Sequence, residues 1–194
     1  MNTVYVLPLG QVPAQVLEWI DGIVAEWLPM PSQRLGAVPV PQAAYDAKRG
    51  QYQSTEIMRA IANHAPGDAC RVLGVTEMDL AIPTLTFLFG QAQLDGAVAL
   101  VSLARLRQEF YGLPADEALL RERVAKEVLH ELGHTFGLTH CHDPKCAMSL
   151  STHVGLVDAK DESYCTNCGI RLARKASTLM EKAHEEGMAD SGSR

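Results

Sequence analysis

The sequence predicts an α/β fold in which helices back a mixed, twisted β-sheet. Between residues 3 and 136, apolar segments of strand length alternate with longer segments of helical periodicity. This alternation is typical of domains whose helices cover the faces of a sheet. The chain has 194 residues, of which 47% are hydrophobic, so it is long enough to bury a sizeable core. We expect no membrane partner, because no apolar run reaches the length of a membrane span.

Five segments have the apolar composition and short length of β-strands. They are residues 3–7, 35–40, 70–75, 85–89 and 97–103. Prolines interrupt segment 35–40, which predicts a strand near an edge of the sheet, where a missing amide hydrogen is tolerated. The other four segments are continuous enough to form the body of the sheet.

Helical periodicity predicts four helices, each with one apolar face. The first covers residues 12–28, and Ser54 is expected to cap the second. The third, central helix begins near residues 114–116 and ends at Phe136, and a fourth lies near the C-terminus. The residues expected on the buried faces are Val16, Ile20, Ile23, Val24 and Trp27; Ile57, Met58 and Ile61; Leu120, Val124, Val128 and Leu132; and Leu172, Ala176, Leu179, Met180 and Ala183.

The central helix ends in histidines that have the spacing of metal ligands. His130 and His134 are four residues apart, so an α-helix places them on one face, where both can bind one metal ion. Gly137 can adopt the left-handed conformation that ends a helix, which turns the chain so that His140 supplies a third imidazole. Three protein ligands leave a fourth tetrahedral position open, which is typical of a catalytic zinc rather than a structural one.

Glu131 follows His130 on the helix and is the candidate general base. Its carboxylate can reach a zinc-bound water, remove a proton as that water attacks a carbonyl, and pass the proton to the leaving amine. The arrangement therefore predicts hydrolysis of peptide bonds in a peptide or protein substrate. A bare His-Glu-x-x-His match also occurs by chance on solvated helices, but the added glycine and third histidine strongly favour the zinc interpretation.

Four cysteines follow the histidines and predict a second, structural zinc site. Cys141 and Cys146 form one pair, and Cys165 and Cys168 form a Cys-x-x-Cys pair. Two such pairs are the arrangement of a closed four-thiolate site, and two disulfides are the alternative. Residues 1–8 lack the basic start of a signal peptide, so we expect a reducing cytoplasm, where thiolates bind metal more readily than they pair.

The remaining cysteine and four other histidines receive no metal role. Cys70 lies in an apolar run and is expected to be a buried thiol. His142 lies between two cysteines, but a complete set of four thiolates makes it a bystander rather than a ligand. His64, His153 and His184 match no ligand spacing and are expected on the surface.

This combination of motifs resembles the archaemetzincin family of metzincin zinc peptidases. The resemblance rests first on a third histidine joined directly to the first of four cysteines, and it covers essentially residues 3–182. The residues that carry it are His130 to His140, Cys141, Cys146, Met148, Cys165 and Cys168. Similar segments in the N-terminal half are residues 49–52, 74–80, 87–90 and 101–106.

The resemblance implies a metzincin-like fold, two zinc ions and activity as a cytoplasmic zinc metallopeptidase. It implies that Met148, which alone would be taken for an ordinary core residue, lies in a turn that forms a hydrophobic floor under the histidines. It also implies that peptide binds as an added strand along a sheet edge, which we place within residues 84–90. The family usually has asparagine and phenylalanine where this chain has Ser149 and Tyr164.

We expect two subdomains and a short tail. Residues 1–137 would form an N-terminal α/β subdomain that includes the active-site helix. Residues 138–187 would form a small C-terminal subdomain with the methionine turn, the four-cysteine zinc site and a terminal helix. The polar residues 188–194 are predicted to be disordered.

The leading hypothesis is a zinc-dependent metallopeptidase that acts as a monomer. One alternative is a catalytically silent zinc-binding protein of the same fold that binds peptides without cutting them. Another is a nucleic-acid-binding finger built from the four cysteines. The net charge of −6 argues against a nucleic-acid partner, because backbone phosphates require a basic surface.

Overall fold

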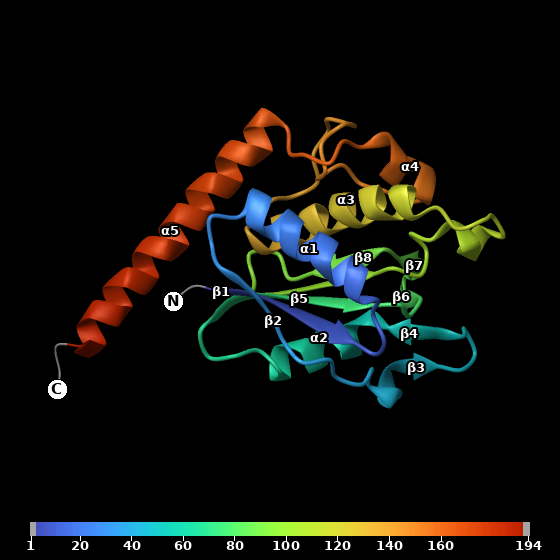
Figure 1. The fold of residues 1–194 in the computed structure, drawn as a ribbon, viewed down its shortest axis with the longest axis horizontal. Helices are drawn as coiled ribbons and strands as arrows, with labels where there is room; N and C mark the ends of the chain where they lie inside the picture. Colours follow the sequence, from blue (N-terminus) through green and yellow to red (C-terminus); the bar gives the residue numbers. More distant parts are fainter. Residues whose placement is uncertain (1–2, 192–194) are drawn as a thin grey trace.

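The computed structural model describes residues 3–191, and for residues 182–191 it describes only the course of the backbone (Figure 1). A five-stranded sheet forms its centre, in the order β2-β1-β5-β9-β8. The first four strands are parallel, and β8 joins them antiparallel at one edge. The strands are β1 (Thr3–Leu9), β2 (Ser32–Arg34), β5 (Ala69–Thr76), β9 (Val98–Ser102) and β8 (Gly90–Ala92).

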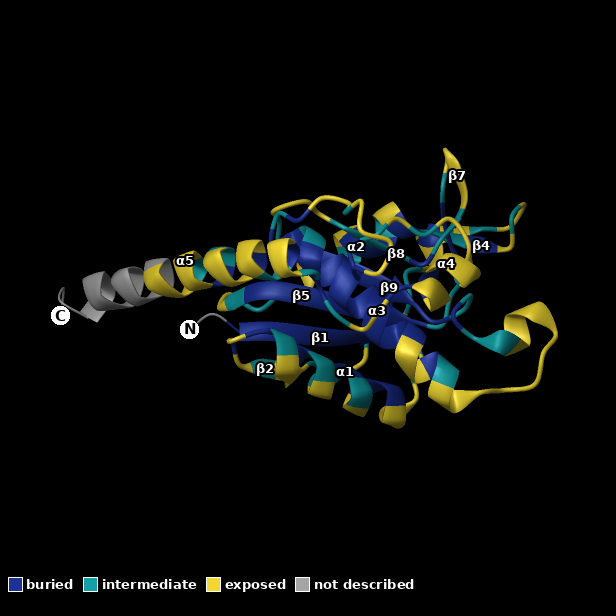
Figure 2. Cartoon of the chain, turned by 90° about the horizontal axis from the view of Figure 1, so that it is seen from above, coloured by how far each residue is buried: buried dark blue, intermediate teal, exposed yellow. Residues whose placement is uncertain are grey.

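Helices cover both faces of this sheet, as its composition predicts. Every residue of β1 is buried, because a parallel strand between two helical layers meets apolar groups on both sides. Helix α1 (Ala14–Trp27) and helix α3 (Glu117–Thr135) pack on one face, and helix α2 (Ser54–Asn63) packs on the other. Figure 2 shows the buried strands enclosed between these helices.

A second, four-stranded sheet lies beside the first, in the order β3-β4-β6-β7. It consists of β3 (Tyr45–Asp46), β4 (Gln51–Gln53), β6 (Leu80–Ile82) and β7 (Leu85–Leu88), and a short 3₁₀ helix η1 (Gln42–Ala44) precedes it. Phe89 is the single residue between β7 and β8, so the chain passes there from one sheet to the other. Both β7 and β8 are therefore edge strands that follow one another directly.

Helix α3 begins and ends with recognisable signals. The Asp116 carboxylate accepts a hydrogen bond from the Leu119 amide at 2.9 Å, which caps the first turn. At the other end Gly137 has φ of +80°, and the Leu138 amide donates to the Gly133 carbonyl at 3.0 Å. This glycine-terminated ending folds the following chain back against the helix.

The C-terminal part of the chain packs against α3. After the 3₁₀ helix η2 (Gln108–Tyr111) and α3 come α4 (Val154–Ala159) and α5 (Thr166–Ser191). The core includes Met148, Val157 and Leu172 together with residues of α1 and α3, so it runs across the boundary between the two expected subdomains. Figure 1 shows α5 continuing outward beyond the rest of the fold.

The structure corrects two local predictions. Segment 35–40 is not a strand; β2 lies before it, and Val38 makes only an isolated bridge to Leu9. Prolines at 39 and 41 cannot donate to a ladder, which explains the interruption. Ser54 does not cap α2, because it is the first helical residue and its Oγ donates to Gln91 Oε1 at 2.5 Å.

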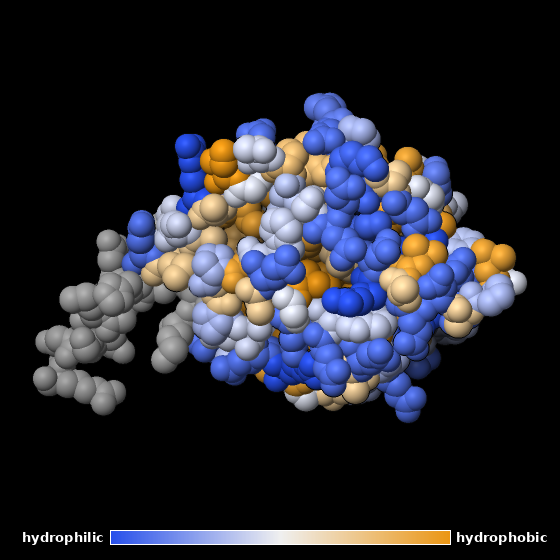
Figure 3. Space-filling model, turned by 45° about the horizontal axis from the view of Figure 1, so that its top comes forward, coloured by the Kyte–Doolittle hydropathy of each residue, from blue (hydrophilic) through white to orange (hydrophobic). Residues whose placement is uncertain are grey.

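Strands β3, β4, β6 and β8 and helix α4 lie outside the predicted elements, since each is too short to produce a periodic signal. Helix α5 includes residues 188–191, where a disordered tail is predicted, and residues 192–194 lie outside the described part of the chain. Among the described residues, no helix combines the length and apolarity needed to cross a membrane. On the face seen in Figure 3, apolar side chains form small separate groups among hydrophilic ones.

Candidate metal centres and active site

The last turns of α3 and the chain that follows bring three histidines together. His130 and His134 come from the helix, and His140 comes from the loop after Gly137. One nitrogen from each of the three rings can be chosen so that all lie within 4.8 Å of one another. The Nε2 atoms of His130 and His134 are 3.1 Å apart. The predicted trio is thus close enough in space to share one ion.

Backbone carbonyls orient the two helical imidazoles. His130 Nδ1 lies 2.8 Å from the Ala147 carbonyl, and His134 Nδ1 lies 2.7 Å from the Leu138 carbonyl. A carbonyl only accepts, so each Nδ1 carries the proton and donates, which leaves a lone pair on each Nε2. Two lone pairs that face each other at 3.1 Å cannot bond to one another, and a cation between them resolves the conflict.

The geometry fits zinc. Zinc–nitrogen bonds of about 2.0–2.1 Å in a tetrahedron separate the ligand nitrogens by roughly 3.3 Å, close to the spacing of the two Nε2 atoms. Burial lowers the pKa of His130 well below its ordinary value of 6.5, and Lys160 and His134 lower it further. Burial also lowers the pKa of His134 and of His140. All three shifts favour the neutral form that binds a metal.

Glu131 is buried beside the histidines and lines the same cavity. Burial raises the pKa of its carboxyl well above 4.5, and the neighbouring Glu127 raises it further. A group with a raised pKa binds a proton readily, which is what a general base must do. A dication held by the histidines would oppose this shift and favour the carboxylate.

Met148 packs against the end of α3. It is fully buried, and its Sδ fills the space beside Gly133, where any side chain would collide with it. The Tyr164 hydroxyl donates to the Leu129 carbonyl at 2.6 Å and closes the same region. Met148 therefore packs on the helix between the turns that carry the two histidines.

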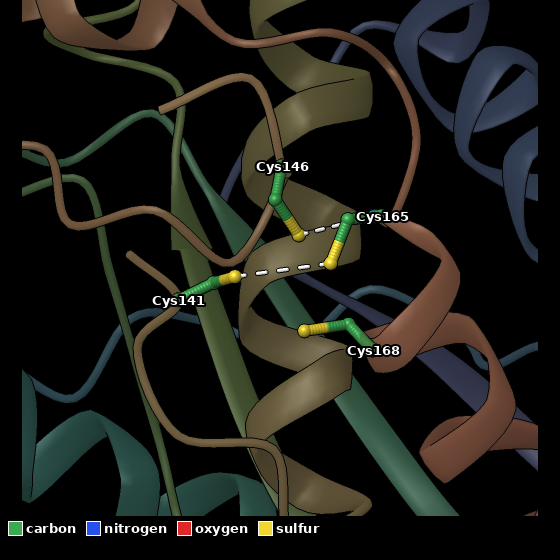
Figure 4. A group of neighbouring side chains, drawn as sticks. All are labelled: Cys141, Cys146, Cys165 and Cys168. Carbon is green, nitrogen blue, oxygen red and sulfur yellow. Dashed lines mark hydrogen bonds between the residues drawn. The ribbon is translucent and has the colours of Figure 1, made fainter. Parts of the chain in front are cut away.

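The four predicted cysteines converge at the beginning of α5 (Figure 4). Cys141 Sγ and Cys165 Sγ are 3.8 Å apart, and all four sulfur atoms lie within 4.8 Å of one another. Zinc–sulfur bonds of about 2.3 Å in a tetrahedron give a sulfur–sulfur spacing of roughly 3.8 Å, whereas a disulfide requires about 2.05 Å. All four thiols are free, so the arrangement fits a metal rather than two disulfides.

Hydrogen bonds connect this cluster to the histidine site. The Cys141 amide donates to the Met148 carbonyl at 2.9 Å, and the Cys165 amide donates to Cys146 Sγ at 3.3 Å. The segment between Cys141 and Met148 also carries Ala147, whose carbonyl orients His130. The two centres therefore share one short piece of chain.

A cavity of about 680 Å³ lies over the histidines. Residues of β7 and β8, Glu131 of α3 and residues 150–152 line it. The apolar part of its wall consists of Leu85, Phe87, Leu88, Phe89, Ala92, Leu94 and Leu150. The cavity thus joins the histidine site to two sheet edges.

Sequence reasoning missed Lys160 as a member of this region. Its side chain is fully buried, and its Nζ lies 3.3 Å from Glu127 Oε1 and 3.5 Å from His130 Nδ1. Nothing in the local sequence distinguishes this lysine from an exposed one, because its burial arises from packing between α4 and α3. The bystander residues agree with expectation where described: His142 is exposed, and Cys70 is buried beside Met30.

Comparisons with known proteins point to one family. The sequence pattern of peptidase family M54 matches residues 14–174. The chain is 42% identical to the archaemetzincin of Methanocaldococcus jannaschii over 161 residues, which cover 83% of this chain and 87% of the relative. It is 40% identical to the archaemetzincin of Pyrococcus furiosus over 180 residues, 90% of this chain and 94% of the relative.

Solved structures agree. The crystal structure of archaemetzincin from Archaeoglobus fulgidus, complexed with malonate, is 36% identical and gives a TM-score of 0.76 over 87% of this chain and 99% of that chain. The crystal structure of archaemetzincin from Methanopyrus kandleri is also 36% identical, with a TM-score of 0.77 over 91% of this chain and 96% of that chain.

Proposed function

Because the chain belongs to peptidase family M54, the archaemetzincins, and is a zinc metallopeptidase, we propose that His130, His134 and His140 hold its catalytic zinc. We further propose that Glu131 is its general base. The observation that carries this proposal is the pair of facing Nε2 atoms, 3.1 Å apart, whose lone pairs need a cation between them. Backbone carbonyls hold both rings in that orientation.

Each side chain around the site has a separate role in the proposed hydrolysis. His130, His134 and His140 would hold a zinc ion, which would lower the pKa of a bound water to about 7 and polarise a substrate carbonyl. Glu131 accepts a proton at its carboxylate from the attacking water and later donates it to the leaving amine nitrogen. Met148 and Gly133 support the helix turns that carry the ligands. The substrate class is peptide or protein.

The register of β8 supports substrate binding as an added strand. The Ser102 amide of β9 donates to the Phe89 carbonyl at 2.8 Å, and the Gln93 amide donates to the Val98 carbonyl of β9 at 2.9 Å. In an antiparallel pair alternate residues point their backbone groups toward the partner strand. The N–H and C=O groups of Gly90 and Ala92 consequently point toward the open side, where an extended peptide would pair with them.

Strand β7 has fewer free backbone groups for such pairing. Arg49 donates to the carbonyls of Leu85 at 2.7 Å and Thr86 at 2.8 Å. Gln51 also donates to the Thr86 carbonyl, at 3.0 Å. We therefore place the substrate strand at the end of the predicted range 84–90 and beyond it, along Gly90–Ala92.

The four-cysteine cluster supports a second zinc ion with a structural role. Its sulfur spacing fits a closed tetrahedral site, which leaves no position for substrate. We propose two zinc ions per chain, one catalytic and one structural. Free cysteines that serve as zinc ligands are typical of a reducing compartment, so we also propose that the protein acts in the cytoplasm. We propose that it acts there as a monomer.

The experiment that tests the function is substitution of Glu131 by glutamine. Glu131→Gln preserves size but removes the proton acceptor, so peptide cleavage should fall at least about 10²-fold while zinc content stays unchanged. An unbiased peptide library, with and without chelator, provides the assay, and metal analysis provides the control. Undiminished cleavage by the variant would refute the role of Glu131. A zinc-loaded wild type that binds peptides but cuts none would favour the silent binding protein.

A further inference from the structure

Gly90 lies directly against the carboxylate of Glu131. A Cβ atom at position 90 would be 2.6 Å from both Cγ and Oε1 of Glu131 and 2.7 Å from its Cδ. Non-bonded carbon and oxygen atoms do not approach that closely, because optimal contacts lie near 3.5–4.0 Å. The backbone of Gly90 is not in the left-handed region that favours glycine. A side chain at position 90 would therefore force the Glu131 carboxylate or the strand to move.

Packing rather than hydrogen bonding determines where this carboxylate lies. Among the described residues, no side chain or amide donates a hydrogen bond to the Glu131 carboxylate, although the residue is only 5% exposed. The Glu131 carboxylate consequently occupies the space that the missing side chain of Gly90 leaves open. A methyl group in that space would push the carboxylate away from β8, and the helix backbone behind Glu131 limits the directions in which it can move.

Gly90 also belongs to the strand that we assign to substrate. None of the described residues bonds to its outward N–H and C=O groups at the edge of the five-stranded sheet, and it lines the cavity over the histidines. One residue therefore touches the proposed base and pairs with the proposed substrate. We propose that Gly90 is a positioning residue, which sets the distance between the Glu131 carboxylate and the peptide bond held on β8. This inference rests on the proposed function.

The test compares Gly90→Ala with Gly22→Ala. Gly22 lies on the exposed side of α1, and a Cβ there meets nothing within 4 Å, so it controls for the substitution itself. For Gly90→Ala we expect kcat to fall about 10²-fold, since a displacement of roughly 1 Å has that effect. KM should stay within about twofold, because the paired backbone groups remain, and zinc content should equal that of wild type. A kcat within about twofold of wild type would overturn the proposal.

A double variant separates positioning from general damage to the fold. Glu131→Asp shortens the side chain by one methylene, so it relieves the collision when position 90 carries a methyl group. We expect Glu131→Asp to reduce kcat much less in the Gly90→Ala background than in the wild-type background. Equal reductions in both backgrounds would mean that the two residues act independently, which contradicts the proposal.

Crystal structures of zinc-loaded wild type and Gly90→Ala provide a readout that does not depend on turnover. The proposal requires the Glu131 carboxylate to move away from β8 in the variant while the histidines stay in place. An unmoved carboxylate, with the strand displaced instead, would overturn it. If the wild type cuts no peptide but the carboxylate is displaced in Gly90→Ala, the proposed function is refuted and the packing relation between Gly90 and Glu131 is established.

Discussion

Each helical histidine of the site carries its proton on one nitrogen, and the backbone decides which one. The carbonyls of Ala147 and Leu138 accept from His130 and His134, so both Nε2 atoms are free to bind metal. Both carbonyls come from chain beyond α3, after the turn at Gly137. The helix places the two proposed ligands, and the segment after it determines their tautomers.

The lowered pKa values of these residues predict the pH at which zinc is lost. Protons compete with zinc for the same imidazole lone pairs, so zinc leaves as the pH falls. Because burial lowers the pKa of all three histidines, each is half protonated only at a pH below the ordinary value of 6.5. We expect half of the catalytic zinc to be released below about pH 6.5.

Dialysis against a weak chelator over a series of pH values, followed by metal analysis, measures this release. The His130→Ala, His134→Ala double variant is the control, because its remaining zinc reports the cysteine site alone and can be subtracted from the total. Half-release above about pH 7 would contradict the expected direction of the shifts.

At the scale of elements, α4 is attached to α3 by charged side chains. Arg123 of α3 makes two hydrogen bonds to the Asp158 carboxylate, at 2.6 and 2.8 Å. Lys160, at the end of α4, pairs with Glu127 of α3. These contacts fix the segment that leads from the cavity wall at residues 150–152 to the cysteines.

The buried pair predicts a large effect on stability. Lys160→Met leaves the Glu127 carboxylate buried without its cation, and removing one partner of such a pair costs about 3–5 kcal/mol. Both side chains are almost fully inaccessible, with exposures of 0% and 3%, so solvent cannot compensate. Urea unfolding should show the loss, and replacing Glu127 by leucine in the same chain should restore most of it.

An exposed ion pair is the matched control. Lys145 and Asp161 are 3.8 Å apart with exposures of 65% and 60%, so Lys145→Met should change the free energy of unfolding far less. Equal effects of Lys145→Met and Lys160→Met would show that burial of the Glu127–Lys160 pair has no special role.

The elements differ in how well the sequence predicts them. Helix α3 is predictable because its apolar stripe, its Asp116 cap and its terminal Gly137 agree with one another. Strand β8 is not, because Gly90–Ala92 is short and contains no β-branched or aromatic residue. The roles of Gly90 and Lys160 depend on residues distant in the chain, which a single sequence does not reveal. The histidines and cysteines are predictable because their spacing encodes their geometry.

At the scale of the whole molecule, one core connects the sheet, α3 and the C-terminal part of the chain. Cys146, Ala147 and Met148 are buried in that core together with residues of α1 and α3. The four-cysteine cluster therefore joins the start of α5, which carries Cys165 and Cys168, to the segment with Cys141 and Cys146 beside the histidine site. A zinc ion there would stabilise the fold and the catalytic centre together.

This connection predicts the effect of removing the cysteine ligands. Wild-type protein purified without chelator should contain two zinc ions per chain, and the Cys165→Ser, Cys168→Ser double variant should contain at most one. Its Tm should fall by at least about 5 °C, because structural zinc contributes directly to folding. The catalytic zinc should also leave more readily, since the loop that holds the Ala147 carbonyl against His130 would be less well fixed.

Metal analysis and thermal unfolding measure these effects, and Cys70→Ser is the control because Cys70 lies outside the cluster. A wild type with a single zinc ion would contradict the two-site assignment. An unchanged Tm of the double variant would contradict the structural role of the cysteines.

The free edge at Gly90–Ala92 has a consequence for what the enzyme would cut. A segment that pairs with this edge must offer amide and carbonyl groups that are not already engaged. Helices and sheets of compact proteins have used those groups internally, so native domains would escape cleavage. Flexible linkers, chain ends and unfolded polypeptides would be accepted, and selection would act on conformation before it acts on residue identity.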